Sequence, residues 1–261
     1  MTKGNRGGKR AGRAKVNSVN QDFPEAFRPG KDYEAIGGVD HVARTVTEET
    51  QQDWDAYASK MNNGVTAEDQ TAINGYVRSF HAFDINRALY DPNNAGKTVD
   101  QIFSQAQDRE TVEALDKSIS NNVTPTDGSY VRFTNSQAIQ AAYGLTSQEM
   151  TMIAQAPQMD DAQLAQLNRV LSGKTSFSGS FTSASANSSL NAFSNPYAKQ
   201  SKGYWYERKI NVPQGTHAYA PINNAQESEV IFGRKMGTKL AGISVDSDGH
   251  IVFHEWFDGY K

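Results

Sequence analysis

The spacing of apolar residues changes once along the chain, and this change limits the folds that the sequence can adopt. Between residues 66 and 90, apolar side chains recur at three- and four-residue intervals, as on one face of an α-helix. From about Thr175 the period is two, and stretches rich in Val, Ile and aromatic residues alternate with Gly, Asn and Asp. Helices followed by strands in separate parts of the chain predict an α+β fold.

Helix signals are frequent in the first two-thirds of the chain. Thr45, Thr66 and Thr146 each precede an acidic residue by three positions, as N-caps do. Together with the apolar spacing, these signals predict helices over 45–62, 66–90, 98–106, 112–119, 136–143, 146–154 and 160–171. Strands are expected at 128–133, 180–185, 204–212, 225–232, 241–245 and 251–257.

Composition excludes several classes of protein. A chain of 261 residues with 37 % apolar residues is long enough for one catalytic domain with additions, or for two small domains. No apolar run approaches the roughly 18 residues of a membrane span, and residues 1–20 lack the apolar stretch of a signal peptide. We therefore expect a cytoplasmic protein, or one exported by a route that needs no cleaved signal. The chain has no cysteine and only five scattered histidines, so we expect neither disulfides nor a metal.

The first 20 residues form a basic stretch of different composition. They contain six Lys or Arg residues, four glycines and no acidic residue, while the net charge of the whole chain is −3. Such a stretch predicts a flexible cationic tail. Weak contact with nucleic acid and simple solubilisation are both open to it.

Two glutamates, Glu227 and Glu229, stand two residues apart before an apolar run. On a strand they would point to the same face, roughly 6 to 7 Å apart, where like charges repel. Taken alone, the pair is explained by a solvated strand end. Two further elements lie upstream: Arg132, within an expected strand, and an aromatic-x-Ser-x-Ser element that contains Ser183. Arg132 precedes Ser183 by 51 residues, and Ser183 precedes Glu229 by 46.

This order resembles the Arg-Ser-Glu class of mono-ADP-ribosyltransferases, which includes the cholera, C3 and binary toxins and several phage enzymes. Further matches lie between these blocks and after them. Asn86 and Leu89 resemble a helical motif that precedes the arginine strand, and 193–196, 210–215, 218–221 and 233–238 resemble successive loops and turns of the family. The resemblance covers about residues 70 to 257. It departs at Ala184, where a hydroxyl is missing, and at Tyr90, where the family often has a basic residue, so altered NAD binding is expected at both.

The resemblance implies a fold with a helical first half and two packed, mainly antiparallel sheets that form an NAD cleft. It implies a division into a basic tail (1–20), a helical extension (21–65) and a catalytic domain (66–261). NAD would be a substrate, no metal would be needed, and the partner would be a protein with an accessible arginine.

The resemblance also implies roles for individual residues. Glu229 would stabilise the ribosyl cation formed when nicotinamide leaves, and Glu227 would orient the acceptor, the Glu-x-Glu pair being associated with arginine. Ser183 would hold Glu229 and the ribose, and Arg132 would bind the diphosphate or ribose through its planar fork. The weaker candidates for NAD or target contacts are Phe193, Asn86, Lys199, Lys202 and Tyr219.

Structural interpretations stay open for each of these residues. Arg132 is also explained by a surface ion pair, Ser183 by a strand hydroxyl, and Asn86 by a bond within its own helix surroundings. Tyr219 and Phe193 are also explained by packing. For the whole chain, the alternatives to arginine transfer are NAD hydrolysis and a catalytically silent virion or binding protein with this fold.

Overall fold

The computed structural model describes residues 23–27, 48–77, 81–187, 205–247 and 249–261, together with the backbone of two short strands at 34–36 and 43–45. The helices are α1 (Glu48–Met61), α2 (Ala67–Val77), α3 (His81–Tyr90), α4 (Val99–Ile102), α5 (Ala106–Asn121), α6 (Ser136–Tyr143), α7 (Ser147–Ala154) and α8 (Asp161–Leu171). The strands are β1 (Glu34–Ile36), β2 (Ala43–Thr45), β3 (Gly128–Asn135), β4 (Thr175–Phe177), β5 (Thr182–Ser185), β6 (Trp205–Val212), β7 (Ala218–Tyr219), β8 (Glu229–Phe232), β9 (Met236–Val245) and β10 (Ile251–Tyr260).

Several predicted helix starts are confirmed by their caps. Thr146 and Asp160 each accept a hydrogen bond from the backbone three residues on, in reciprocal capping boxes at the starts of α7 and α8. Gly144 ends α6 in the left-handed conformation, with φ at 59°. Two predicted bounds were wrong. Thr45 belongs to β2, so the first helix begins at Glu48, and the pattern over 66–90 is divided into α2 and α3.

Eight strands form one hydrogen-bonded sheet in the order β4-β9-β10-β6-β3-β5-β8-β7, antiparallel throughout except for the parallel pair β6 and β10. The joint between β3 and β5 is narrow, with one registered residue pair, Val131 with Ser185. The two sheets that were expected are thus joined into one, with five strands on one side of this joint and three on the other. The α+β class and the expected fold are confirmed.

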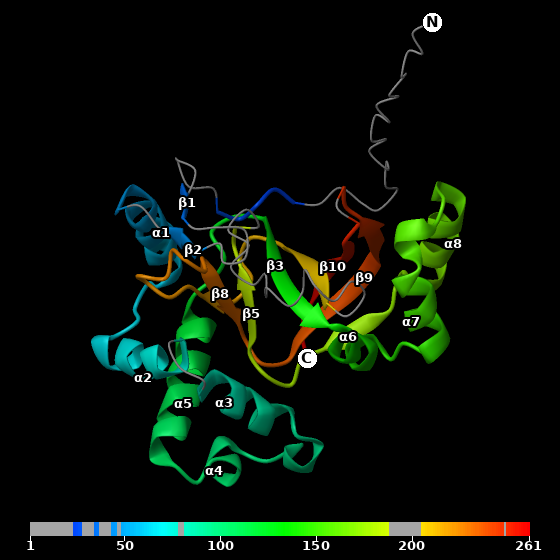
Figure 1. The fold of residues 1–261 in the computed structure, drawn as a ribbon. Helices are drawn as coiled ribbons and strands as arrows, with labels where there is room; N and C mark the ends of the chain where they lie inside the picture. The colour runs from blue at the N-terminus through cyan, green and yellow to red at the C-terminus, as the bar shows by residue number, and fades with distance from the viewer. Residues whose placement is uncertain are drawn as a thin grey trace, which may run out of the picture.

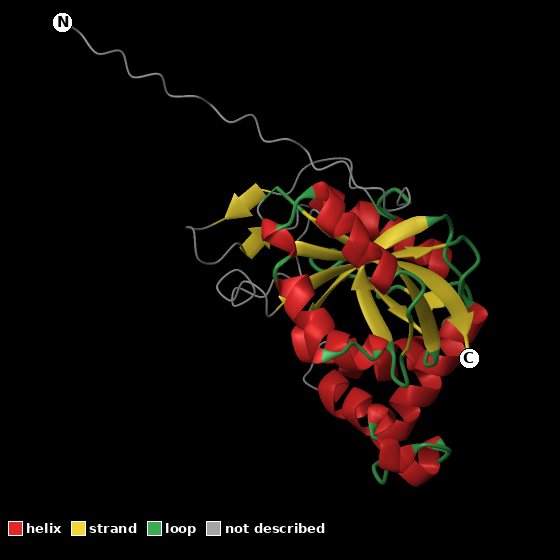
Figure 2. Cartoon of the chain, turned by 90° about the vertical axis from the view of Figure 1, so that its right-hand side faces the viewer, coloured by secondary structure: helices red, strands yellow, loops and turns green. Residues whose placement is uncertain are grey.

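Three apolar cores fasten helices to different parts of the sheet (Figures 1 and 2). Helices α6 to α8 pack on β6, β9 and β10 through residues such as Ile139, Leu167 and Phe253. Helices α2 to α5 lie below the sheet in both views and pack on β7, β8 and Phe181, the residue before β5. Each helical group thus covers the strands on one side of the joint between β3 and β5.

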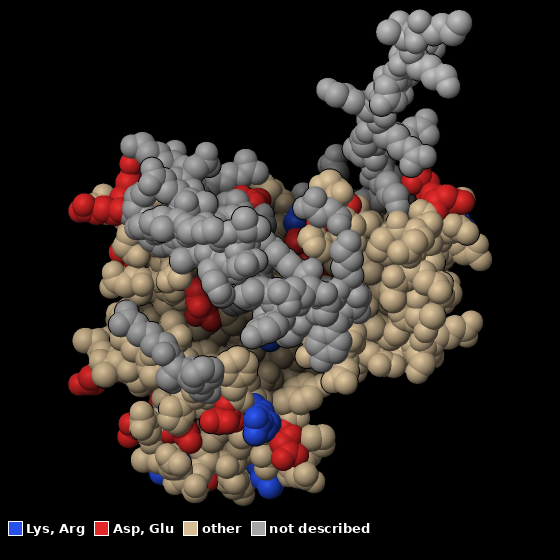
Figure 3. Space-filling model, in the orientation of Figure 1, with Lys and Arg blue, Asp and Glu red and all other residues tan. Residues whose placement is uncertain are grey.

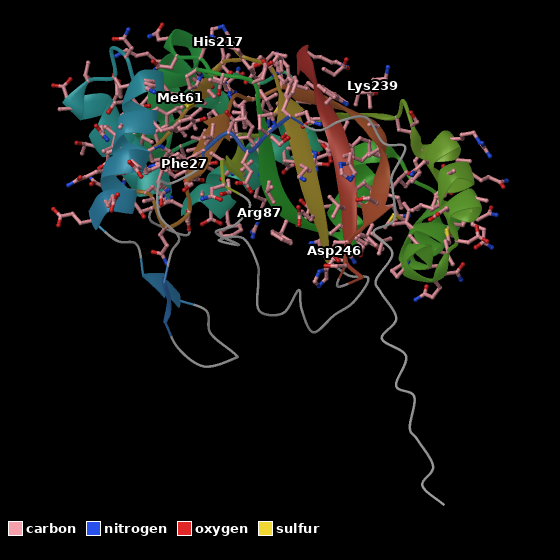
Figure 4. All side chains as sticks on the ribbon, turned by 90° about the horizontal axis from the view of Figure 1, so that it is seen from above. Phe27, Met61, Arg87, His217, Lys239 and Asp246 are labelled. Carbon is pink, nitrogen blue, oxygen red and sulfur yellow. The ribbon has the colours of Figure 1, made fainter. Side chains whose placement is uncertain are left out.

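The third core joins α1 and residues 23–27 to the centre of the sheet. Phe27, Trp54 and Met61 pack with Tyr130 of β3 and Val230 of β8. Figure 4 shows Phe27 and Met61 on the same side of the sheet, next to α1. The expected extension over 21–65 therefore shares, in its described parts, a core with the expected catalytic domain.

Residues 23–27 also form polar contacts with the sheet. The Phe23 backbone N–H donates to Asn211 Oδ1 at 3.0 Å, and Ser129 Oγ donates to the Phe23 carbonyl at 2.5 Å. Gly128 allows this approach, because a Cβ there would lie 2.5 Å from the Cβ of Ala26. Residues 1–20, the expected basic tail, lie outside the described part of the chain. Among the described helices, none has the length and apolar character that a membrane span requires.

Candidate functional site

Three neighbouring strands bring together the arginine, serine and glutamate that the sequence singled out. Arg132 lies on β3, Ser183 on β5 and Glu229 at the start of β8. Arg132 Nη1 donates to the Ser183 carbonyl at 2.9 Å, and Ser183 Oγ donates to Glu229 Oε1. Residues separated by 51 and 46 positions in the sequence thus form one continuous chain of hydrogen bonds.

The strand alternation of β5 explains the departure at Ala184. Ser183 meets Glu229 through its side chain, whereas Ala184 is paired with Val230 and is fully buried in the core beside it. A hydroxyl at position 184 would therefore face this core and not the carboxylate. Ser185 Oγ donates to the Glu227 carbonyl at 2.9 Å, which ties β5 to the turn before β8.

Glu227 lies in that turn and not on a strand, so the prediction that both glutamates share a strand face was wrong. The strand begins at Glu229, and the turn occupies the preceding residues. Ser228 has a positive φ of 44° and Asn223 one of 59°. These left-handed residues break the extended backbone, and the Ser228 N–H closes the turn on the Asn224 carbonyl at 2.8 Å. We call residues 220–228 the glutamate turn.

Helix α1 and Asn62, the residue after it, hold the glutamate turn through three hydrogen bonds. Trp54 Nε1 donates to the Pro221 carbonyl at 2.8 Å, and Asn62 Nδ2 donates to the Ala220 carbonyl at 2.6 Å. Asp55 Oδ1 accepts from the Asn223 N–H at 2.8 Å. Sequence reasoning missed this contact, because it joins residues that lie more than 150 positions apart.

Glu229 is held in an environment that disfavours its charge. It is 6 % exposed, and burial raises the pKa of its carboxyl to about 7, with the nearby Glu227 adding to the rise. Ser183, Arg132 and Asn224 act in the opposite direction. Burial also raises the pKa of Glu227, while a hydrogen bond from Asn224 lowers it. Both carboxyls therefore titrate closer to neutral pH than ordinary glutamates do.

Arg132 retains capacity to bind an anion. Its neighbour across the strand pair, Arg208, is engaged by Glu255 through two hydrogen bonds of 2.6 Å. Arg132 donates, within the described residues, to the Ser183 carbonyl, so most of its N–H groups remain available. Burial and the Arg208 charge lower the pKa of Arg132, and an anionic ligand would relieve both effects.

Asn86 on α3 reaches this site through Tyr76 on α2. Asn86 Nδ2 donates to the Tyr76 hydroxyl at 2.7 Å, while Asn86 Oδ1 is buried without a hydrogen-bond partner in the described part of the chain. Burial raises the pKa of Tyr76 to about 12, and the charge of Glu229 adds to the rise. Asn86 is therefore hydrogen-bonded to a tyrosine whose pKa depends on the charge of Glu229. The Asn86 Oδ1 atom can accept one further hydrogen bond.

The weaker sequence candidates divide into two groups. Tyr219 is 1 % exposed and packs in the core under α2 to α5, so the packing interpretation is confirmed and contact with a target was a wrong prediction. Phe193, Lys199 and Lys202 lie outside the described residues. Tyr90, where the family often has a basic residue, is exposed at the end of α3. The basic residue in the last turn of this helix is Arg87 (Figure 4).

The face of the molecule in Figure 3 is hollowed between the helices around α3 and those around α6. Within the described residues, no group of three or more His, Asp and Glu side chains is placed to hold a metal ion. The site contains two carboxyls with raised pKa values, Glu227 and Glu229, and the Arg132 guanidinium, which has unused N–H donors. The Ser183 hydroxyl lies between Arg132 and Glu229. Such a set can bind an anion and stabilise a positive charge next to it.

Known proteins resemble this chain in sequence family and in structure. A family model described as ADP-ribosyltransferase exoenzyme matches residues 51–252. The chain is similar in structure to C3stau2 from S. aureus, solved with NAD, at a TM-score of 0.60 and 20 % identity, covering 83 % of this chain and 98 % of that one. It is also similar to the Clostridium limosum C3 exoenzyme, at a TM-score of 0.56 and 17 % identity, covering 89 % and 100 % of the two chains.

A third similar structure is Plx2a, an ADP-ribosyltransferase toxin from Paenibacillus larvae, with a TM-score of 0.55 and 16 % identity over 81 % of this chain and 96 % of that one. A comparison with the curated proteins finds no match. At these identities the structural similarity supports the fold, and the family model is the finding that supports an activity.

Proposed function

Since the chain belongs to the ADP-ribosyltransferase exoenzyme family, whose substrate is NAD, we propose that it transfers ADP-ribose from NAD to arginine side chains of target proteins. The observation that carries the proposal is the hydrogen-bonded chain from Arg132 through Ser183 to Glu229, with Glu227 in the adjoining turn. The proposal includes action in the cytosol of a host or target cell.

In this proposal Glu229 supports the cleavage of NAD. The bond between ribose C1 and the nicotinamide nitrogen breaks, the electron pair leaves with nicotinamide, and positive charge develops on the ribose. The ionised Glu229 carboxylate stabilises that charge, as carboxylates do beside oxocarbenium-like transition states. Ser183 holds the carboxylate in place, and Arg132 and Asn86 bind the cofactor.

Glu227 acts on the acceptor. A guanidinium nitrogen of the target attacks ribose C1, a new C–N bond forms, and one proton must leave that nitrogen. The raised pKa of Glu227 suits a general base, because the most effective base titrates close to the working pH. Its place in a turn, partly exposed, leaves it accessible to a side chain of another protein.

NAD hydrolysis is the second candidate, because water can replace the guanidinium at the same cation. Purified protein incubated with labelled NAD, with and without a cell extract, separates the two functions from a silent binding protein. We expect label on protein, mapped by mass spectrometry to arginine. Free ADP-ribose without labelled protein would favour hydrolysis, no product at all would favour a silent protein, and label on another residue type would contradict arginine specificity.

A variant of Glu227 sharpens the test. Glu227→Gln should leave NAD hydrolysis within a few-fold of the wild type, because Glu229 is unchanged. Transfer to arginine should fall by about 10²- to 10⁴-fold, the usual effect of losing a positioned base. Gln226→Ala, at an exposed position of the same turn, is the matched control and should alter neither reaction. Equal loss of both reactions in Glu227→Gln would contradict the role of Glu227 as acceptor base.

A further inference from the structure

Asn224 stands where the two functional glutamates meet. Its Nδ2 donates to Glu229 Oε2 at 3.2 Å, and its carbonyl accepts the Glu227 N–H at 3.3 Å. Its side chain also lowers the pKa of Glu227. Glu229 Oε1 is occupied by Ser183, so Asn224 and Ser183 engage the two oxygens of one carboxylate. No sequence signal singled out Asn224, which stands in a Pro-Ile-Asn-Asn stretch typical of a turn.

The backbone fixes Asn224 independently of its side chain. Its carbonyl accepts the N–H groups of Glu227 and Ser228, at 3.3 and 2.8 Å, and these two bonds close the turn. The preceding residue, Asn223, is anchored to α1 through Asp55. The backbone of Asn224 is thus fixed on both sides, which leaves its side-chain amide available to donate hydrogen bonds to the carboxylates.

On the basis of the proposed function, we propose that Asn224 is a positioning residue whose side-chain amide holds Glu229 and Glu227 in one arrangement, so that cleavage of NAD and acceptance of the target's proton occur side by side. Two carboxylates this close repel each other, and a neutral donor shared between them offsets the repulsion without supplying a counter-charge. A lysine or arginine at this place would compete with the ribosyl cation for Glu229.

Asn224 should also affect the protonation of Glu229. The charged or titratable groups that act on or sense Glu229 are Glu227 in the turn, Arg132 on β3, Tyr76 on α2 and Tyr219 on β7. Of these only Arg132 favours the ionised carboxylate, and Ser183 and Asn224 favour it by donating hydrogen bonds. Loss of the amide therefore raises the pKa of Glu229 further. As a result, a smaller fraction of this carboxylate is ionised at neutral pH.

The test compares Asn224→Ala and Asn224→Asp with the wild type. Asn224→Asp keeps the shape of the side chain but adds a third carboxyl and removes the donor. At neutral pH we expect hydrolysis of NAD to fall by about 10-fold in Asn224→Ala, the scale of one hydrogen bond to a charged group, and further in Asn224→Asp. Hydrolysis should recover as the pH is raised, because Glu229 then ionises without the amide. Transfer to arginine should not recover, because Glu227 remains displaced.

A second measurement does not depend on activity. Carbon-13 NMR titration of the glutamate carboxyl carbons, assigned with Glu227→Gln and Glu229→Gln, should show the Glu229 midpoint at higher pH in both Asn224 variants. An unchanged midpoint with unchanged hydrolysis and transfer would overturn the role of Asn224 while leaving the proposed function intact. A wild type that cleaves no NAD would contradict the proposed function, and the NMR titration would still decide whether Asn224 controls the carboxyls. Gln226→Ala is again the matched control.

Discussion

At the scale of single residues, the site depends on a carboxyl that is buried and yet must be ionised. Burial raises the pKa of Glu229 to about 7, while Ser183, Arg132 and Asn224 hold it below the value that burial alone would give. A carboxylate poised in this way is weakly solvated, so it interacts strongly with a positive charge that develops next to it. The same balance makes its ionisation sensitive to pH in the neutral range.

Glu229→Gln should abolish hydrolysis and transfer together. The amide cannot stabilise the cation, and the loss should be about 10²-fold or more, near 3 kcal/mol in the barrier. In the wild type, hydrolysis should fall as the pH drops below about 7, since only the ionised carboxylate is active. Rates measured from pH 5 to 9 check this dependence, and near-normal hydrolysis by Glu229→Gln would contradict the assignment.

The same substitution should change stability in a pH-dependent way. The folded-state pKa of Glu229 is raised above its unfolded value, so its contribution to stability is present below about pH 4.5 and is lost as the pH rises through about 7. Glutamine carries no such titration. In thermal unfolding, the variant should lose less stability than the wild type between pH 5 and 8, which separates an electrostatic effect from misfolding.

The resemblance to a known family predicted the three strand residues of the site but not their surroundings. Arg132, Ser183 and Glu229 each carry a local signal, namely an arginine among β-formers, an alternating serine pair and a glutamate before an apolar run. The left-handed Ser228 has no such signal, so alternation placed Glu227 on the strand. The Arg208–Glu255 pair was also missed, because it depends on the parallel pairing of β6 with β10, which no local pattern specifies.

At the scale of elements, α1 supports the glutamate turn from outside the sheet. The whole of α1 was predicted as a helix, but its function follows only from the three hydrogen bonds that it and Asn62 form with 220–223. The turn carries Glu227 and precedes Glu229, so movement of its backbone would displace the acceptor base before it affects the strand. We therefore expect α1 to matter more for transfer than for NAD cleavage.

Asp55→Ala tests this relation. It removes the acceptor of the Asn223 N–H, and the cost in stability should be about 1 kcal/mol, the usual net value of one hydrogen bond. Transfer to arginine should fall several-fold, while hydrolysis changes less. Gln52→Ala, an exposed position on the same helix, serves as the control and should resemble the wild type. Equal losses in both reactions would show that α1 supports the whole site and not the turn in particular.

At the scale of the whole molecule, residues 23–27, which precede the expected catalytic domain at 66–261, pack into the core of the described fold. Phe23 bonds to Asn211 and Ser129, and Phe27 packs on Trp54 with ring centroids 5.2 Å apart. The contacts of 23–27 could not be foreseen, because a short stretch without periodicity gives no indication of its partner.

Two truncations separate the basic tail from the fold. Deleting residues 1–20 removes six positive charges and, with Phe23 and Phe27 retained, should leave NAD hydrolysis and the thermal midpoint unchanged. Any contact of the tail with nucleic acid should appear as weaker binding to polyanions, with an effect that fades as salt is raised. Deleting residues 1–27 should in contrast lower stability by about 3 kcal/mol or more, because the loss of Phe27 leaves a space in the core beside Trp54. Loss of hydrolysis or of soluble expression on deletion of residues 1–20 would show that these residues belong to the fold. Unchanged stability on deletion of residues 1–27 would show that the packing of Phe27 on α1 does not stabilise the molecule.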